Sequence, residues 1–90
     1  MLTESCCLKF TRGHRLQHDK VRDLWLIQAP EKAFIADNIA AATLNLIDGE
    51  RSIADIINQL ALEYQAPRDI ITKDVLSLLS DLHSKGILSQ

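Results

Sequence analysis

The hydrophobic pattern of this 90-residue chain changes its period at Asp37-Asn38, and this change limits the fold more than any other feature. Before this point, short runs of strand-favouring residues are separated by polar turns. After it, apolar residues recur at the spacing of an amphipathic helix. The order predicts an α+β domain in which a small sheet precedes a set of helices.

Three short extended runs are expected in the first part of the chain. Residues 15–18 and 24–29 flank a polar turn, which is the pattern of a β-hairpin. Pro30 has no backbone N–H and therefore ends the second run. Residues 33–36 then follow a second polar turn as a short third strand. We therefore predict an N-terminal three-stranded antiparallel β-meander.

The first two helices are bounded by recognisable capping residues. Helix one is expected over residues 39–47, with Asn38 as its N-cap. Ser52 is expected to open helix two, and Asp55 three residues later gives a weaker form of the capping box. Both helices carry an apolar face that a small sheet can cover.

The third helix is expected to begin at Asp69 as its cap and to continue to about Lys85. Gly86 is its stop signal, because glycine adopts the left-handed conformation that ends many helices. Ile87-Leu88 could then add a final edge contact. Three strands followed by three helices also describe a winged-helix-like fold.

The chain length predicts a single domain. Residues 1–13 lack clear periodicity and end at Gly13, so we expect a flexible N-terminal arm followed by one domain over residues 14–90. Cys6 and Cys7 are adjacent, and a disulfide between them would be strained. The three histidines are not at ligand spacing either. We expect reduced thiols, no metal and no cofactor.

Charge and motif content argue against several function classes. The net charge of −2 is opposite to that of most nucleic-acid-binding domains. No apolar run approaches the roughly 18 residues of a membrane span, and residues 1–10 do not resemble a signal peptide. No nucleophile with a base, carboxylate pair or phosphate-binding loop is visible. We expect a cytoplasmic protein that is not an enzyme.

The third predicted helix carries an apolar edge beside its core stripe. At about 100° per residue, Leu76 and His83 lie about 80–100° from the stripe centre, with Thr72 between them and the core. In one interpretation Leu76 only widens the buried face. In the other, Leu76, Leu79 and His83 line a groove that this helix shares with a neighbouring strand. The core stripe itself consists of Ile71, Val75, Leu78, Leu79 and Leu82.

Strand 33–36 is the best candidate for the neighbouring strand. An exposed strand edge beside a helix can accept an extended peptide as an added strand. Phe34 and Ile35 point to opposite faces of the predicted sheet. We expect one of them to enter the core and the other to contact a ligand.

An ordered set of short segments over roughly residues 13–88 resembles the PqqD family. None of the segments is specific alone, and the resemblance rests on their order and spacing. The segments are Arg15-Leu16-Gln17, Trp25-Leu26, Ala29-Pro30-Glu31-Lys32, Asp48-Gly49-Glu50-Arg51-Ser52, Ile56-Ile57 with Leu60, Asp74-Val75, Leu78-Leu79 and Lys85-Gly86-Ile87-Leu88.

The resemblance implies a peptide chaperone of pyrroloquinoline quinone (PQQ) biosynthesis. Such proteins bind the precursor peptide PqqA and present it to the radical S-adenosylmethionine enzyme PqqE. Related modules, the recognition elements of ribosomally made and modified peptides (RiPP recognition elements), bind leader peptides beside their third strand and third helix. Carried onto this sequence, the groove falls on Ala33, Phe34, Ile35, Ala36, Thr72, Leu76, Leu79 and His83.

Two alternatives remain open from the sequence. The chain could be the leader-peptide recognition module of another modified-peptide pathway. A winged-helix DNA-binding regulator is disfavoured, because Asp74 and Asp81 offset Lys73 and Lys85 on the third helix. The protein is expected to be a monomer or a weak homodimer, since an exposed strand edge can pair with itself.

Overall fold

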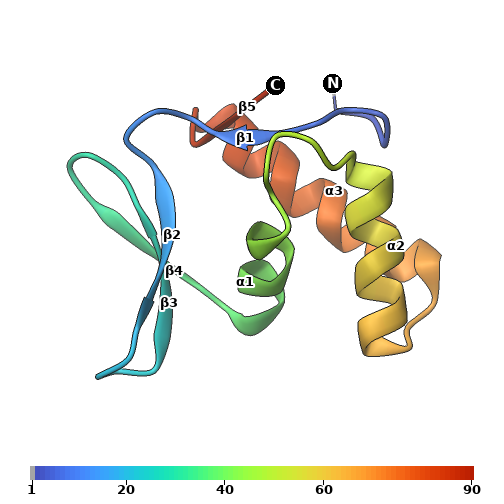
Figure 1. The fold of residues 1–90 in the computed structure, drawn as a ribbon, viewed down its shortest axis with the longest axis horizontal. Coiled ribbons are helices and arrows are strands. Elements are labelled where there is room, and N and C mark those ends of the chain that lie inside the picture. The colour runs from blue at the N-terminus through green and yellow to red at the C-terminus, as the bar shows by residue number, and fades with distance from the viewer. Residues whose placement is uncertain (1) are drawn as a thin grey trace.

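The computed structural model describes residues 2–90 and contains the predicted three-stranded antiparallel sheet. Its strands are β2 (Arg15–Asp19), β3 (Leu24–Gln28) and β4 (Ala33–Ala36), in the spatial order β2-β3-β4. The third strand has the predicted bounds. Figure 1 shows this sheet standing on one side of the helices.

The register of the sheet separates an inner face from an outer face. Leu16 lies opposite Ile27, and Ile27 lies opposite Phe34, so these three side chains share one face and pack against the core. Ile35 lies opposite Leu26 on the other face and is 72% exposed. Phe34 is therefore the residue of the pair that enters the core, and Ile35 faces solvent.

Helices α1 (Asn38–Asn45) and α2 (Ile53–Tyr64) follow the sheet. The N-cap of α1 is Asp37, whose Oδ1 accepts a hydrogen bond of 2.8 Å from the Ala40 N–H. The predicted cap at Asn38 is thus wrong by one residue, and the helix ends two residues before Ile47. The capping box of α2 is confirmed, because Ser52 and Asp55 each accept from the other's backbone N–H.

Helix α3 (Arg68–Ser84) has no side-chain cap at its start. Pro67 occupies the N-cap position and Asp69 lies within the first turn, so the predicted cap at Asp69 is wrong. The other end is a Schellman motif. The Ile87 N–H donates to the Leu82 carbonyl at 3.0 Å, and Gly86 takes the expected left-handed conformation with φ of 77°.

The segment before the sheet packs against the rest of the domain. Strand β1 (Lys9–Phe10) pairs antiparallel with β5 (Leu88–Ser89) at the end of the chain. Leu2 and Leu8 are buried in the core, and Leu8 is only 1% exposed. The expectation of a flexible arm over residues 1–13 is therefore wrong for the packed part, and Met1 lies outside the described residues.

Side-chain contacts also hold this segment in place. Glu4 forms an ion pair with Arg68, which donates a second hydrogen bond to Asn58 on α2 at 2.7 Å. Cys6 and Cys7 are free cysteines. The Thr3 N–H donates to the Cys6 Sγ, and this contact lowers the pKa of the Cys6 thiol.

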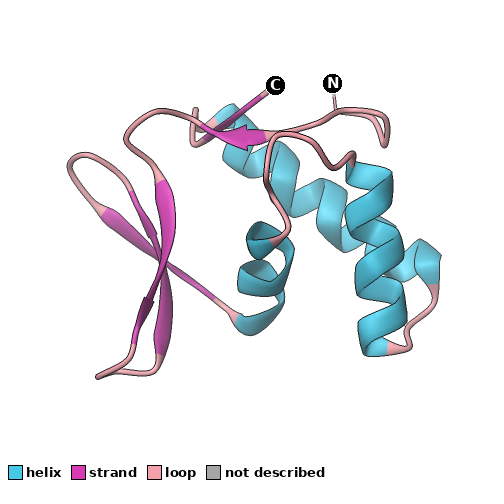
Figure 2. Ribbon diagram, in the orientation of Figure 1, coloured by secondary structure: helices cyan, strands magenta, loops and turns pink. Residues whose placement is uncertain are grey.

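The core lies where the helices meet the inner face of the sheet. Figure 2 shows α1 between the sheet and the pair formed by α2 and α3. No helix among residues 2–90 has the length and apolar character that crossing a membrane would need. The largest fully buried side chains are Leu8, Leu44, Ile53, Ile56, Ile57, Leu60, Leu79, Leu88 and Thr43.

The loop between α1 and α2 contains one of the segments on which the family resemblance rests. The Asp48 carboxylate accepts hydrogen bonds from the backbone N–H groups of Arg51 and Glu50, at 2.8 and 2.9 Å. These bonds hold the pKa of Asp48 below its ordinary value. The Asp48 carboxylate of the Asp-Gly-Glu-Arg segment therefore stabilises the conformation of this loop.

Candidate functional site

Strand β4 has one paired edge and one free edge. It is the last strand of the sheet, and its paired edge contacts β3. In the β3–β4 turn, the Ala29 N–H donates to the Lys32 carbonyl at 2.9 Å. Hydrogen-bonded pairs alternate with non-bonded pairs along an antiparallel ladder, so the next bonded pairs are Ile27–Phe34 and Trp25–Ala36.

This alternation assigns the free backbone groups of β4. Phe34 and Ala36 direct their N–H and C=O groups toward β3, whereas Ala33 and Ile35 direct theirs toward the open edge. An extended chain of another molecule can satisfy such a row of donors and acceptors as a fourth strand. The sequence-predicted strand thus provides an edge with the geometry needed for strand addition.

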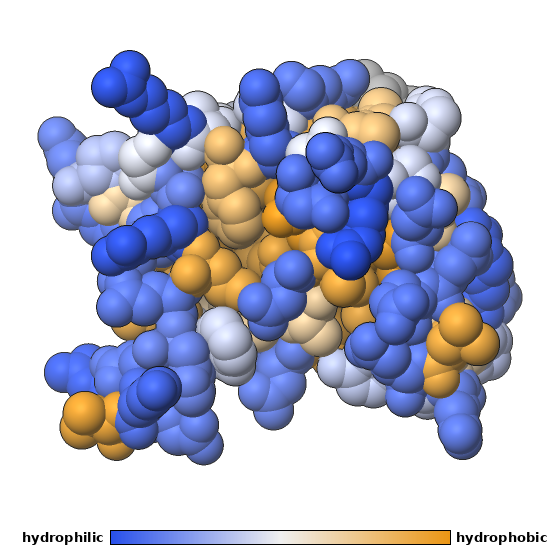
Figure 3. Space-filling model, viewed as in Figure 1, coloured by the Kyte–Doolittle hydropathy of each residue, from blue (hydrophilic) through white to orange (hydrophobic). Residues whose placement is uncertain are grey.

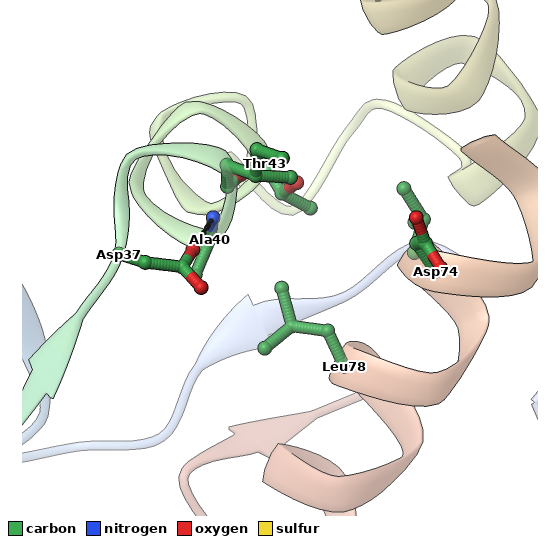
Figure 4. Close-up of a pocket in the computed structure, with 7 residues that line it drawn as sticks. Asp37, Ala40, Thr43, Asp74 and Leu78 are labelled. Atoms are coloured by element: carbon green, nitrogen blue, oxygen red, sulfur yellow. Dashed lines mark hydrogen bonds between the residues drawn. The ribbon is translucent and has the colours of Figure 1, made fainter.

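A hollow of about 210 Å³ lies beyond the end of β4, between α1 and α3. Figure 4 shows Asp37 and Thr43 on the α1 side, with Asp74 and Leu78 projecting from α3 toward them. Thr43 is fully buried, and its hydroxyl donates to the Ile39 carbonyl at 2.9 Å. The Thr43 hydroxyl is thus already satisfied, and most of the other side chains that line the hollow are apolar. The exceptions are the carboxylates of Asp37 and Asp74.

A second hollow, of about 240 Å³, lies at the beginning of β4. It is lined by Phe34 from β4, by Lys85 and Ile87 after α3, and by residues of the adjoining turns. The Nζ atoms of Lys32 and Lys85 lie 5.3 and 5.8 Å from the centre of the Phe34 ring. The two hollows thus flank β4 at its two ends, and α3 or its C-cap contributes to both.

The predicted strand residues differ in their accessibility. Ala33 and Ile35 are exposed, Phe34 is half-buried, and Ala36 is buried with 6% exposure. Ala33 and Ile35 are therefore open to a ligand through both backbone and side chain. Phe34 remains accessible through the hollow beside Lys85, whereas the Ala36 side chain belongs to the core.

The predicted helix residues do not face β4. Leu79 is fully buried. Thr72 is hydrogen-bonded to Arg68, which contacts Glu4 of the N-terminal segment. Leu76 and His83 lie on the same edge of α3 as Thr72, Leu76 half-buried against the core and His83 exposed. The structure thus gathers the strand residues at one edge of α3 and these helix residues at the other edge.

The α3 residues that border the hollows are Asp74 and Leu78, with Lys85 at the helix C-cap. Each of them is two positions from Thr72, Leu76 or His83. Residues two positions apart in a helix lie on nearly opposite sides of its axis. The three residues that border the hollows were not selected from the sequence, because Leu78 was predicted to belong to the core stripe and Asp74 and Lys85 entered only through the charge balance of the third helix. Lys32 was the one available signal for the hollow at the beginning of β4. It lies two positions before Phe34, and residues i and i+2 share a face of a strand.

Figure 3 shows apolar side chains gathered in the middle of one face, between sheet and helices, with hydrophilic side chains around them. Elsewhere, His18 stacks on Trp25 with ring centres 4.6 Å apart and contacts Asp23 at 3.3 Å. Within residues 2–90, no three metal-ligating side chains lie close enough together to hold an ion. The arrangement can bind an extended chain through its backbone and select a few side chains at the two hollows.

The family of the chain follows from a match to a family model. The model described as "Coenzyme PQQ synthesis protein D (PqqD)" matches residues 25–88. The chain therefore belongs to the PqqD family, which the resemblance of its short segments had indicated.

Relatives and solved structures agree with this membership. The PqqA binding protein of Gluconobacter oxydans is 56% identical over 88 residues, covering 98% of this chain and 92% of the relative. The PqqA binding protein of Bradyrhizobium diazoefficiens is 44% identical over 79 residues, covering 88% and 77%.

The solution structure of the PqqD truncation of Methylobacterium extorquens PqqCD, described as a functional, stand-alone RiPP recognition element, matches with a TM-score of 0.86. It is 34% identical, and the match covers 100% of this chain and 96% of that one. The crystal structure of Xanthomonas campestris PqqD matches with a TM-score of 0.64 and 37% identity, covering both chains completely. These matches confirm the predicted fold class. The family to which the chain belongs is not a family of enzymes, as predicted.

Proposed function

We propose that this chain binds the precursor peptide PqqA as an added strand along the free edge of β4 and presents it to the radical S-adenosylmethionine enzyme PqqE. The observation that carries the proposal is the outward direction of the backbone groups of Ala33 and Ile35, next to hollows bordered by Leu78 and Lys85. Membership of the PqqD family, and the similarity to relatives named PqqA binding protein, support PqqA as the ligand.

Strand addition explains how such a small domain can hold a peptide firmly. Backbone hydrogen bonds supply affinity that is independent of sequence, and side chains entering the hollows add selectivity. A short precursor peptide is disordered when free, so ordering it lowers its affinity for any partner. A module that holds the peptide extended and also contacts the enzyme raises the effective concentration of the peptide at the active site.

A titration of ¹⁵N-labelled protein with synthetic PqqA, with and without PqqE, tests this proposal. We expect a dissociation constant in the micromolar range or below, with the largest amide shifts in β4 and along the α3 edge that contains Leu78. When PqqE is added to the complex with PqqA, we expect further amide shifts that PqqA alone does not cause. Absence of shifts with PqqA would contradict peptide binding, and PqqA shifts without any PqqE effect would contradict presentation.

Two leucines of α3 provide a matched test of which helix edge binds the peptide. Leu76 and Leu78 are both half-buried and both pack against the core, so truncation of either to alanine should lower the free energy of unfolding by about 1–2 kcal/mol. Only Leu78 lines the hollow beside β4. Leu78→Ala should therefore weaken PqqA binding about five- to tenfold, and Leu76→Ala less than twofold.

The comparison uses calorimetric titration for affinity and urea unfolding for stability. Equal losses of affinity in the two variants would show that both changes act through the fold. A larger loss in Leu76→Ala would place the groove on the edge that contains Thr72 and His83.

A further inference from the structure

The hollow at the beginning of β4 contains more positive charge than its neighbours balance. Lys32 and Lys85 both approach the Phe34 ring, and His14 completes the polar part of the lining. Asp81 accepts a hydrogen bond of 3.0 Å from the Lys85 Nζ. Lys32 forms no ion pair with any side chain in residues 2–90. One ammonium group at this hollow is therefore available to a ligand.

The hollow beyond the other end of β4 has the opposite charge. Its walls include Asp37 and Asp74, and the remaining lining side chains come from Ile39, Ala40, Thr43, Val75 and Leu78. No lysine or arginine lines it. An extended chain lying along β4 thus meets a positive site at the Ala33 end and an apolar site with negative walls at the Ala36 end.

From this asymmetry we infer that the Lys32–Lys85 hollow binds a carboxylate side chain of the peptide and thereby fixes the peptide's direction and register along β4. The inference rests on the proposed function and names the side-chain class that the site selects. Phe34 forms an apolar floor that contacts the methylene groups of a bound Asp or Glu. The Lys32 ammonium group is available to its carboxylate, and Lys85, which also bonds to Asp81, adds to the positive charge of the site.

The opposite hollow makes the register unique. It takes an apolar side chain, and its two carboxylates repel an acidic one. Lys32 and Asp37 are five positions apart, which is about 16 Å along an extended strand. The selected peptide therefore has an acidic residue and an apolar residue about four to six positions apart. A chain shifted by two residues keeps its pattern of backbone hydrogen bonds but loses both side-chain contacts, and a reversed chain loses both contacts and must also form the other type of ladder.

Charge removal at the hollow tests the inference. In the double variant Lys32→Gln/Lys85→Gln, we expect synthetic PqqA to bind about tenfold more weakly at low salt. The affinity of the wild-type protein should fall with added salt more steeply than that of this variant, because the ammonium–carboxylate attraction is screened. The matched control is Lys20→Gln/Lys73→Gln, which changes the net charge equally at exposed positions outside both hollows. It should bind within twofold of the wild type.

Substitution in the peptide identifies the partner of the lysines. Each Asp or Glu of PqqA is replaced singly by its amide and titrated against the wild type and both double variants. One replacement should weaken binding to the wild type about tenfold and leave binding to Lys32→Gln/Lys85→Gln unchanged, as expected of directly coupled groups.

Three results would overturn the inference. The two double variants could lose affinity equally, which would indicate only a general attraction between protein and peptide. In the second result, neither double variant loses affinity. In the third, no single acidic residue of PqqA shows the coupling. All three results still require that wild-type protein binds PqqA, so they differ from the complete absence of binding that would contradict the proposed function. Urea unfolding of each variant confirms that affinities are compared between folded proteins.

Discussion

Replacing Ile35 with proline is expected to lower the affinity for PqqA about tenfold or more while the domain stays folded. The Ile35 N–H points to the open edge of β4, so its loss removes no hydrogen bond within the sheet. The same change removes the β4 donor to which a carbonyl of the added strand would bond, and places the proline ring where the peptide backbone should lie. The lost hydrogen bond and this steric contact together account for about 1.4 kcal/mol or more.

Two further variants separate the backbone effect from other effects. Ile35→Ala removes most of the side chain but keeps the N–H, and should lose much less affinity than Ile35→Pro. Ala36→Pro removes an N–H that points to β3, and should lower the free energy of unfolding by about 1–3 kcal/mol because the Trp25 carbonyl loses its partner. Calorimetric titration and urea unfolding measure the two quantities. Unchanged affinity in folded Ile35→Pro would exclude strand addition at β4.

The second large effect concerns the N-terminal segment. Leu8→Ala should lower the free energy of unfolding by about 3 kcal/mol, because Leu8 is almost fully buried and its truncation leaves a cavity in the core. This is a substantial part of the 5–15 kcal/mol, roughly, that stabilises a small domain. The variant should remain a cooperative two-state protein with a lower urea midpoint.

Leu62→Ala is the matched control for this prediction. Leu62 is 76% exposed on α2, so the same chemical change should alter stability by less than about 0.5 kcal/mol. If Leu8→Ala were as stable as Leu62→Ala, the segment before β2 would contribute nothing to the fold, as expected for a flexible arm.

Local rules predicted the sheet well because each strand boundary has a local cause. Pro30 ends β3, and the turn it opens restarts the chain at Ala33, which is where β4 begins. The helix starts were harder to place where two capping residues compete. Asp37 and Asn38 both suit an N-cap, and only the backbone geometry determines that the Asp37 carboxylate accepts from Ala40.

The structure places the two groups of predicted site residues differently: the strand residues form the free edge of β4, whereas Thr72, Leu76 and His83 lie on the side of α3 away from the two hollows. A helical wheel shows that α3 has a core stripe with two flanks, but it does not show which flank faces the sheet. That choice depends on how α3 crosses α2 and the N-terminal segment, which are contacts between residues distant in sequence. The Leu76 flank is the more apolar of the two, and for this reason it was preferred.

The N-terminal segment shows the same limit more clearly. Leu2, Leu8 and Phe10 follow no period, and the strand that pairs with Lys9–Phe10 lies at the far end of the chain. Local pattern contains no information about such a partner. The absence of a clear period and the glycine at position 13 favoured the interpretation as an arm.

The pairing of β1 with β5 joins the beginning of the fold to its end. Lys9 lies opposite Ser89, so 80 positions of sequence are closed by a two-residue ladder into a non-covalent ring. The closure entropy of such a ring rises only slowly with its length, and buried neighbours such as Leu8 and Leu88 offset it. The two strands nearest the ends of the described chain are therefore held side by side. The exposed β2–β3 turn around Val21, which is 96% exposed, is a second place where the chain could begin and end, with the present ends linked and every layer of the domain unchanged.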